Sequence, residues 1–257
     1  MAKLSRVLSD KLNKSDLSKK STLINRLASR KISKKISDDI LLGNLFIKCV
    51  DDQIIDLTEN HSIIVSRTKL ATNIHSPDTS KCMEFNGKDT NINVPEDGTF
   101  NLGLDDFTID WWEYKLPLPE NNWKLNIPTT QFSFYKNTLD KKQPYKIKNS
   151  DHKSIYLSSD GDHWDIADDK YMGTMPEEKW IHWAITRSND NFYTFKHGIL
   201  KNVWISNLPV NNSDELLTIG SGPKGNNFYG YITNFRFVKG QALWIDEFKP
   251  INDELFY

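Results

Sequence analysis

Apolar residues follow two different rhythms along the chain. Before about residue 40, Leu4, Val7 and Leu8 recur at helical spacing, and the apolar residues of 23–27 do so again. This period of three to four residues is that of short amphipathic helices. From about residue 41 the pattern changes to short β-type runs divided by polar turns, which continue to the C-terminal end of the sequence. The pattern predicts a helical N-terminal arm followed by an all-β body.

The predicted strands are short and closely spaced, as in a sandwich of antiparallel sheets. They cover 45–50, 54–57, 62–66, 82–86, 107–114, 130–135, 153–158, 179–187, 191–196, 201–206, 215–219 and 228–238. Turn dipeptides such as Asp160-Gly161 and His197-Gly198 lie between them, and both dipeptides tolerate positive φ. No helix-length periodic segment interrupts the strands, which excludes a parallel βαβ architecture. We expect one β-sandwich over residues 61–257, with 41–60 either a connector or its first strands.

Two of these strands predict which side chains face the core. In 107–114, Phe107, Ile109 and Trp111 alternate with a more polar set, so one face of this strand should be core. In 179–187 both faces are largely apolar. Such a strand is central in its sheet, with the opposing sheet on one side and a loop, the arm or a partner on the other.

Four ordered runs of sequence resemble a known superfamily. They are CMEFNG (82–87), DDFTIDWWEY (105–114), EKWIHWAITRSNDNFYTFKHGIL (178–200) and LTIGSGPKGNNFYGYITNFRFVKGQALW (217–244). In residues, order and spacing they resemble the laminin-G-like, concanavalin A-like lectin/glucanase superfamily. The resemblance covers roughly residues 60–250 and implies an antiparallel, jelly-roll sandwich. His197-Gly198 stands where that family usually has Asn-Gly, and the stretch 115–152 matches no motif and is expected to be an elaborated pair of loops.

Charge separates the arm from the body. Residues 1–40 hold eleven Lys or Arg and four Asp, a net charge of +7, whereas the rest of the chain carries −8. A basic arm on an acidic body favours docking of the arm onto an acidic surface, although a disordered Lys-rich tail is the alternative. The sequence has no segment apolar enough to span a membrane and no apolar core of a signal peptide at its start. Cys49 and Cys82 are too few for a disulfide framework and are expected to be buried, reduced thiols.

The segment SSDGDHWDIADD (158–169) is the best candidate for a ligand site. Its oxygen-bearing side chains suit Ca²⁺ and its tryptophan ring can stack on a sugar. The candidate ligand-binding residues are Asp160, Asp162, His163 and Trp164, and the candidate calcium ligands are Asp160, Asp162 and Asp165. The segment lacks the twelve-residue calcium-loop pattern, however, and Asp-Gly-Asp is also ordinary turn chemistry.

Trp123 is a second candidate for ligand binding. It lies in a loop rich in Pro and Asn, where its ring either marks a binding surface or covers the core from outside.

Glycoside hydrolases need a pair of carboxylates that point at one sugar. Asp110 and Glu113 are the nearest pair, but a spacing of three puts them on opposite faces of a strand. We expect Asp110 on an exposed face and Glu113 near a strand end, and no catalytic residues. The histidines show no pair at metal-ligand spacing, and the sequence has no phosphate-binding glycine loop.

Lectin-like sandwiches joined to a basic helical arm resemble structural proteins of phages and other viruses. The sequence therefore predicts a non-enzymatic virion protein, a capsid decoration or a tail component, that displays its sandwich and binds host surface glycans. It would be made in the host cytoplasm, contact other virion proteins through residues 1–40 as part of an oligomeric assembly, and require no cofactor unless calcium binds. A soluble carbohydrate-binding lectin and a glycoside hydrolase are the alternatives.

Overall fold

The structure is a computed structural model that describes residues 43–72, 74, 76–78, 81–138 and 143–250. The predicted helical arm, residues 1–40, lies outside the described residues. No helix in the described part of the chain is long and apolar enough to cross a membrane.

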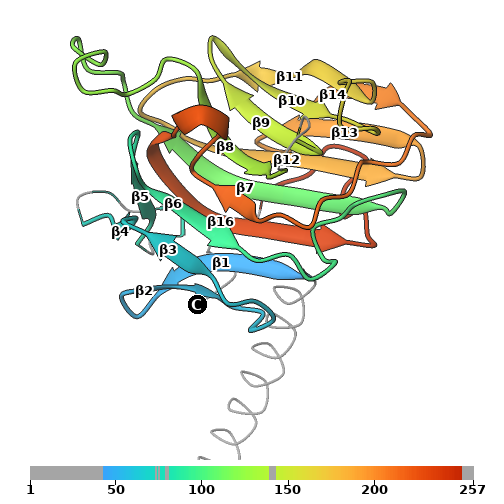
Figure 1. The fold of residues 1–257 in the computed structure, drawn as a ribbon, viewed down its shortest axis with the longest axis horizontal. Coiled ribbons are helices and arrows are strands. Elements are labelled where there is room, and N and C mark those ends of the chain that lie inside the picture. The colour runs from blue at the N-terminus through green and yellow to red at the C-terminus, as the bar shows by residue number, and fades with distance from the viewer. Residues whose placement is uncertain (1–42, 73, 75, 79–80, 139–142, 251–257) are drawn as a thin grey trace, which may run out of the picture. The chain divides into compact units, whose positions relative to one another are not determined.

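The described chain folds into two antiparallel sheets (Figure 1). The first sheet has the strand order β14-β13-β12-β7-β16-β1-β2, with β5 also paired to β16 and β4 to β5. Its strands are β1 (Leu45–Val50), β2 (Gln53–Asp56), β4 (Lys69–Leu70), β5 (Met83–Asn86), β7 (Phe107–Lys115), β12 (Trp180–Ser188), β13 (Asn191–Lys196), β14 (Ile199–Ile205) and β16 (Tyr229–Lys239).

The second sheet has the order β11-β10-β9-β8-β15-β6-β3. Its strands are β3 (Ile64–Ser66), β6 (Asn91–Val94), β8 (Gln131–Lys136), β9 (Tyr145–Asn149), β10 (His152–Leu157), β11 (Ala167–Thr174) and β15 (Leu217–Ile219). One short 3-10 helix, η1 (Pro223–Gly225), precedes β16. The predicted all-β, antiparallel sandwich is confirmed.

Several strands differ from the expected ones. Residues 41–60, left open between connector and first strands, contain β1 and β2, and β1 pairs with β16 inside the first sheet. The stretch 115–152 is more than loops, because it contains β9 as well as β8 (131–136), which lies close to the predicted strand at 130–135. The two-residue β4, together with β6 and β11, was not predicted either. β6, β9 and β11 are rich in Asn, Lys or Asp, and their pairing in the sheet outweighs this low β-propensity.

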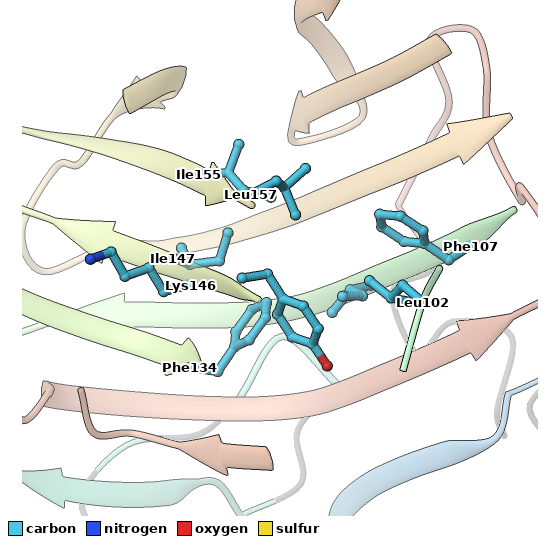
Figure 2. Close-up of a pocket in the computed structure, with 9 residues that line it drawn as sticks. Leu102, Phe107, Phe134, Lys146, Ile147, Ile155 and Leu157 are labelled. Carbon is cyan, nitrogen blue, oxygen red and sulfur yellow. The ribbon is translucent and has the colours of Figure 1, made fainter. Parts of the chain in front are cut away.

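The core lies between the inner faces of the two sheets. Figure 2 shows Phe107 and Leu102 meeting Phe134, Ile147, Ile155 and Leu157 there. Trp111 packs edge-on against Phe134 with ring centroids 5.0 Å apart. Cys49 and Cys82 are buried free thiols, as predicted, and burial raises the pKa of each to about 12.

A C-terminal segment, residues 241–250, covers part of the outer face of the first sheet. Trp244 and Phe248 stack on each other with centroids 3.8 Å apart, and both contact the ring of His182 on β12. Phe248 also packs against Phe195 of β13. The doubly apolar strand at 179–187 is therefore covered on both sides, as predicted, and the cover is a loop-like segment of the same chain.

The C-terminal segment lies close to the backbone of the turn between β13 and β14. His197 and Gly198 have φ values of 51° and 73°, which the His-Gly turn was predicted to tolerate. A Cβ atom at position 198 would lie 1.7 Å from the carbonyl oxygen of Phe248, and the Phe248 amide donates to the Gly198 carbonyl at 3.0 Å. Glycine is thus required here both by the turn and by the crossing segment.

Candidate functional site

The loop between β10 and β11 carries most of the predicted ligand-binding residues. Asp160 shapes its tip, because its carboxylate accepts the backbone amides of Asp162 at 2.7 Å and His163 at 2.8 Å. The His163 ring lies 2.8 Å from the second carboxylate oxygen of Asp160. The hydrogen bond with His163, followed by those from the two amides, holds the pKa of Asp160 well below its usual value. This is the geometry of an Asx turn, with the aspartate ordering its own loop.

The three aspartates predicted to bind calcium do not gather around one point. Asp165 accepts the backbone amide of Ser159 at 2.9 Å and also the Ser159 hydroxyl, while Asp160 serves the turn at the tip of the loop. Within the described residues, no group of three His, Cys, Asp or Glu side chains could hold a metal ion. The geometry gives the predicted calcium site no support, because loop hydrogen bonds use the oxygens of Asp160 and Asp165.

Trp164 lies at the base of this loop on the outer face of the second sheet. Its half-buried ring packs edge-on against Tyr156 of β10, with centroids 5.4 Å apart. The ammonium of Lys146, on the neighbouring strand β9, lies 4.5 Å from the centre of the Trp164 ring and 5.0 Å from that of Tyr156. In Figure 2 the Lys146 side chain points away from the core residues. An amine over two aromatic rings is a cation–π arrangement.

Polar groups border these rings. The Tyr156 hydroxyl donates to Asp169 at 2.6 Å and accepts from Lys148 at 2.9 Å. Burial and the hydrogen bond to Asp169 raise the pKa of Tyr156. Burial alone would raise the pKa of Asp169, but the Tyr156 hydroxyl, Ser154 and nearby cations outweigh it and lower this pKa. We call Trp164, Tyr156, Lys146, Lys148 and Asp169 the Trp164 surface.

The loop between β7 and β8 presents Trp123 to solvent. The Trp123 side chain is 70% exposed, so it does not cover the core. The loop is ordered from within, because the Ile127 amide donates to the Asn122 carbonyl at 2.9 Å and the Asn122 side chain donates to the Ile127 carbonyl at 3.0 Å. Ile127 is buried and lies against Gly87. Trp123 is therefore held out on a fixed loop.

The predicted ligand residues fall into two places. Trp164, Asp160, Asp162 and His163 share the β10–β11 loop, whereas Trp123 projects from the β7–β8 loop elsewhere on the molecule (Figure 1). Lys146, Lys148 and Tyr156 were not among the ligand residues predicted from the sequence. Alternation could have placed Tyr156 on the outer face, since Ile155 and Leu157 flank it on a predicted strand.

Asp110 and Glu113 lie on opposite faces of β7, as their spacing predicted. The expectation that Asp110 is exposed was wrong. It is 5% exposed, and its carboxylate lies 2.8 Å from Arg236 Nε and 3.2 Å from His182 Nε2. Glu113 is fully buried and lies 2.9 Å from the ammonium of Lys153. Each carboxylate is thus bound to a cation on its own side of the sheet.

Among known proteins, only solved structures proved similar to this chain. No protein-family model matches the sequence, and no curated protein matches it. Among solved structures, the binding domain of Paraclostridial Mosquitocidal Protein 1 is similar at a TM-score of 0.63 and 15% identity, over 80% of this chain and 50% of that domain. The botulinum neurotoxin serotype G binding domain gives a TM-score of 0.57 and 14% identity, over 79% and 48%.

A third similar structure is domain 4 of AbnA, a GH43 extracellular arabinanase from Geobacillus stearothermophilus, solved in complex with arabinotriose. Its TM-score is 0.53 at 16% identity, covering 73% of this chain and 87% of that one. This chain spans about half the length of the two toxin binding domains. At these identities the similarities establish the fold.

Proposed function

We propose that this chain is a non-enzymatic, lectin-like protein that binds carbohydrate at the Trp164 surface. The main support is the half-buried Trp164 ring, which packs against Tyr156. The polar atoms of Lys148 and Asp169 lie beside these two rings. Aromatic rings pack on the apolar faces of sugars, and neighbouring charged and hydroxyl groups hydrogen-bond to sugar hydroxyls. The arabinotriose complex of a domain with the same fold supports this choice of ligand class.

Trp123 is proposed as a second, separate contact. Trp123 is 70% exposed, and because its loop is internally hydrogen-bonded, the backbone that carries it loses little conformational entropy on binding. Two separated aromatic contacts would suit an extended or multivalent glycan better than a single monosaccharide.

Glycan binding by matched variants tests the proposal. The full chain is applied to a glycan array and then titrated with the best ligand, alongside Trp164→Ala, Trp123→Ala and Tyr193→Ala. Tyr193 is the control, because it lies on β13 of the other sheet. We expect at least a tenfold loss of affinity for Trp164→Ala, a smaller loss for Trp123→Ala and none for Tyr193→Ala. Full affinity in both tryptophan variants would refute the site, and an array without any bound glycan would refute the function.

Calcium is not required in this proposal. Because loop hydrogen bonds use the oxygens of Asp160 and Asp165, binding should be unchanged by EDTA. A loss of affinity in EDTA that calcium restores would contradict this point and revive the aspartate site.

We further propose that the sandwich is displayed on a virion, as a capsid decoration or tail component, with residues 1–40 contacting other virion proteins. The charge difference between the +7 arm and the −8 remainder supports an electrostatic contact. Full chain carrying Lys19→Glu, Lys20→Glu, Arg30→Glu and Lys31→Glu should no longer co-sediment with assembled particles, and wild-type association should weaken with salt. Unchanged association of this variant would refute the anchoring role.

A further inference from the structure

A sealed polar cluster lies between the two sheets, apart from the Trp164 surface. It consists of Glu113 on β7, Ser133 on β8, Asn149 on β9 and Lys153 on β10, which we call the Glu113 cluster. Asn149 is 1% exposed and the other three are 0% exposed. The Lys153 ammonium lies 5.4 Å from the ring of Trp111. Water is thus excluded from a site that holds an amine, a carboxamide and a carboxylate.

The hydrogen bonds place one carboxylate oxygen against both nitrogens. Lys153 Nζ donates to Glu113 Oε1 at 3.0 Å, and Asn149 Nδ2 donates to the same oxygen at 3.3 Å. The other oxygen, Oε2, is fixed by the Ser133 hydroxyl at 2.6 Å and the Trp111 indole N–H at 2.7 Å. A group that touches two nitrogens at once can take a proton from one and give it to the other.

The amine also lies against the carboxamide itself. Lys153 Nζ is 2.5 Å from Asn149 Oδ1. A carbonyl bond of about 1.23 Å therefore places the carboxamide carbon within about 3.7 Å of the amine, close to the 3–3.5 Å of a near-attack geometry. Lys153 and Asn149 are direct partners in the β9–β10 ladder, so the backbone holds them opposite each other.

The state of the amine suits nucleophilic attack. Burial lowers the pKa of Lys153 to about 8, although the neighbouring Glu113 carboxylate acts in the opposite direction. A buried lysine with a lowered pKa supplies the neutral amine more readily than an exposed one. A salt bridge alone would need only Lys153 and Glu113, whereas here Asn149 contacts both of them.

We propose that Lys153 and Asn149 join in an intramolecular isopeptide bond, with Glu113 as the proton carrier. Glu113 takes a proton from the Lys153 ammonium, and the neutral amine attacks Asn149 Cγ to form the new C–N bond. The Cγ–Nδ2 bond then breaks. Nδ2 receives the proton held by Glu113 and a further proton from the attacking nitrogen, and leaves as ammonium with Glu113 again a carboxylate. The product is a secondary amide that links β9 to β10.

The intact mass of the purified full-length chain tests the bond. We expect a denatured mass lower than that of the sequence by one ammonia molecule. Trypsin should fail to cut after Lys153, and the peptide that begins at Asn149 and runs through Lys153 should carry the loss. A folded wild-type chain with the full sequence mass and normal cleavage after Lys153 would overturn the proposal.

Variants separate this bond from a succinimide at Asn149, which also loses ammonia. Lys153→Arg keeps the positive charge but should show no mass loss, whereas a succinimide would persist in it. Asn149→Ala should also keep its full mass, and Glu113→Gln should react at least tenfold more slowly or not at all. Mass loss that persists in Lys153→Arg would overturn the proposal, and near-ultraviolet circular dichroism checks that each variant is folded.

Discussion

Asp110 and Glu113 stand three residues apart on β7, yet they meet different chemistry on the two faces of the first sheet. Asp110 lies beneath the C-terminal segment against Arg236 and His182. Glu113 lies between the sheets against Lys153 and Asn149. A guanidinium stays protonated and can only pair with its carboxylate, whereas an amine can lose a proton and react. The kind of cation beside a buried carboxylate therefore decides whether the pair is only structural or can also transfer a proton.

The largest effect should come from removing the carboxylate between the sheets. In an Asn149→Ala background, where the proposed bond cannot form, Glu113→Ala leaves the Lys153 cation without its counter-charge in a site with no exposure. Truncating one member of a buried ion pair costs about 3–5 kcal/mol, so we expect the free energy of unfolding to fall by about 4 kcal/mol. Urea denaturation followed by tryptophan fluorescence measures it.

A double variant provides the control for this loss. In the same Asn149→Ala background, Glu113→Leu with Lys153→Met removes both charges and fills the space with apolar side chains, which is often neutral for stability. It should recover most of the loss. A double variant as unstable as Glu113→Ala would show that packing, and not the unpaired cation, determines the cost.

A smaller effect is expected from the carboxylate beneath the C-terminal segment. Asp110→Asn keeps the shape and one hydrogen-bond acceptor, but removes the charge that faces Arg236. Hydrogen bonds between charged groups contribute about 1.5–3 kcal/mol, so a loss of about 2 kcal/mol is expected by the same urea measurement. A loss equal to that of Glu113→Ala would contradict the distinction between the two faces.

Protonation of Asp110 should lower the free energy of unfolding of the wild type at low pH. Burial raises the pKa of Asp110, but the charge of Arg236 and the hydrogen bond with His182 outweigh burial and lower it. The ion pair therefore stabilises the fold above the ordinary carboxyl pKa of about 4, and this contribution is lost as the pH falls through the lower, folded-state value. In urea denaturation between pH 7 and pH 3, Asp110→Asn should show a shallower decline than the wild type. Parallel declines would contradict this origin.

The smallest loss of stability should come from truncating Trp244, a side chain of the C-terminal segment that covers Asp110. Trp244→Ala removes the stack on Phe248 and the ring that lies 5.4 Å from the Arg236 guanidinium. Because Trp244 is only half-buried, we expect a loss of about 1 kcal/mol. The thermal midpoint by calorimetry measures it, and Trp123→Ala, at an exposed site, should leave the midpoint unchanged.

Alternation predicted much of the fold from sequence. β7 and β12 lie where their patterns placed them, and the two apolar faces of β12 correctly predicted a second cover. β9 and β11 were missed because Lys146, Lys148, Asp168 and Asp169 make their sequences look like polar loops. Those side chains lie on the outer face or at the rim of the second sheet, a position that only the pairing of each strand with its neighbours reveals.

The site was harder to predict because it joins three strands and a loop. Asp160 was predicted to bind a metal ion, but its carboxylate accepts hydrogen bonds from two backbone amides of its own loop. Alternation did contain a clue to the Glu113 cluster. Glu113 follows Phe107, Ile109 and Trp111 at every second position, so it had to face the core and needed a buried partner. Which lysine supplied that partner depended on a contact forty residues away in sequence.

The crossing at Gly198 also joins parts of the chain that lie far apart in sequence. The Phe248 amide donates to the Gly198 carbonyl at the turn between β13 and β14, and Trp244 lies over Arg236 of β16, the strand that pairs with β7. The C-terminal segment therefore fastens the β13–β14 edge of the first sheet to its centre. The ring of His182 and the charges of Asp110 and Arg236 lie beneath it, so removal of this segment would open a buried ion pair to water.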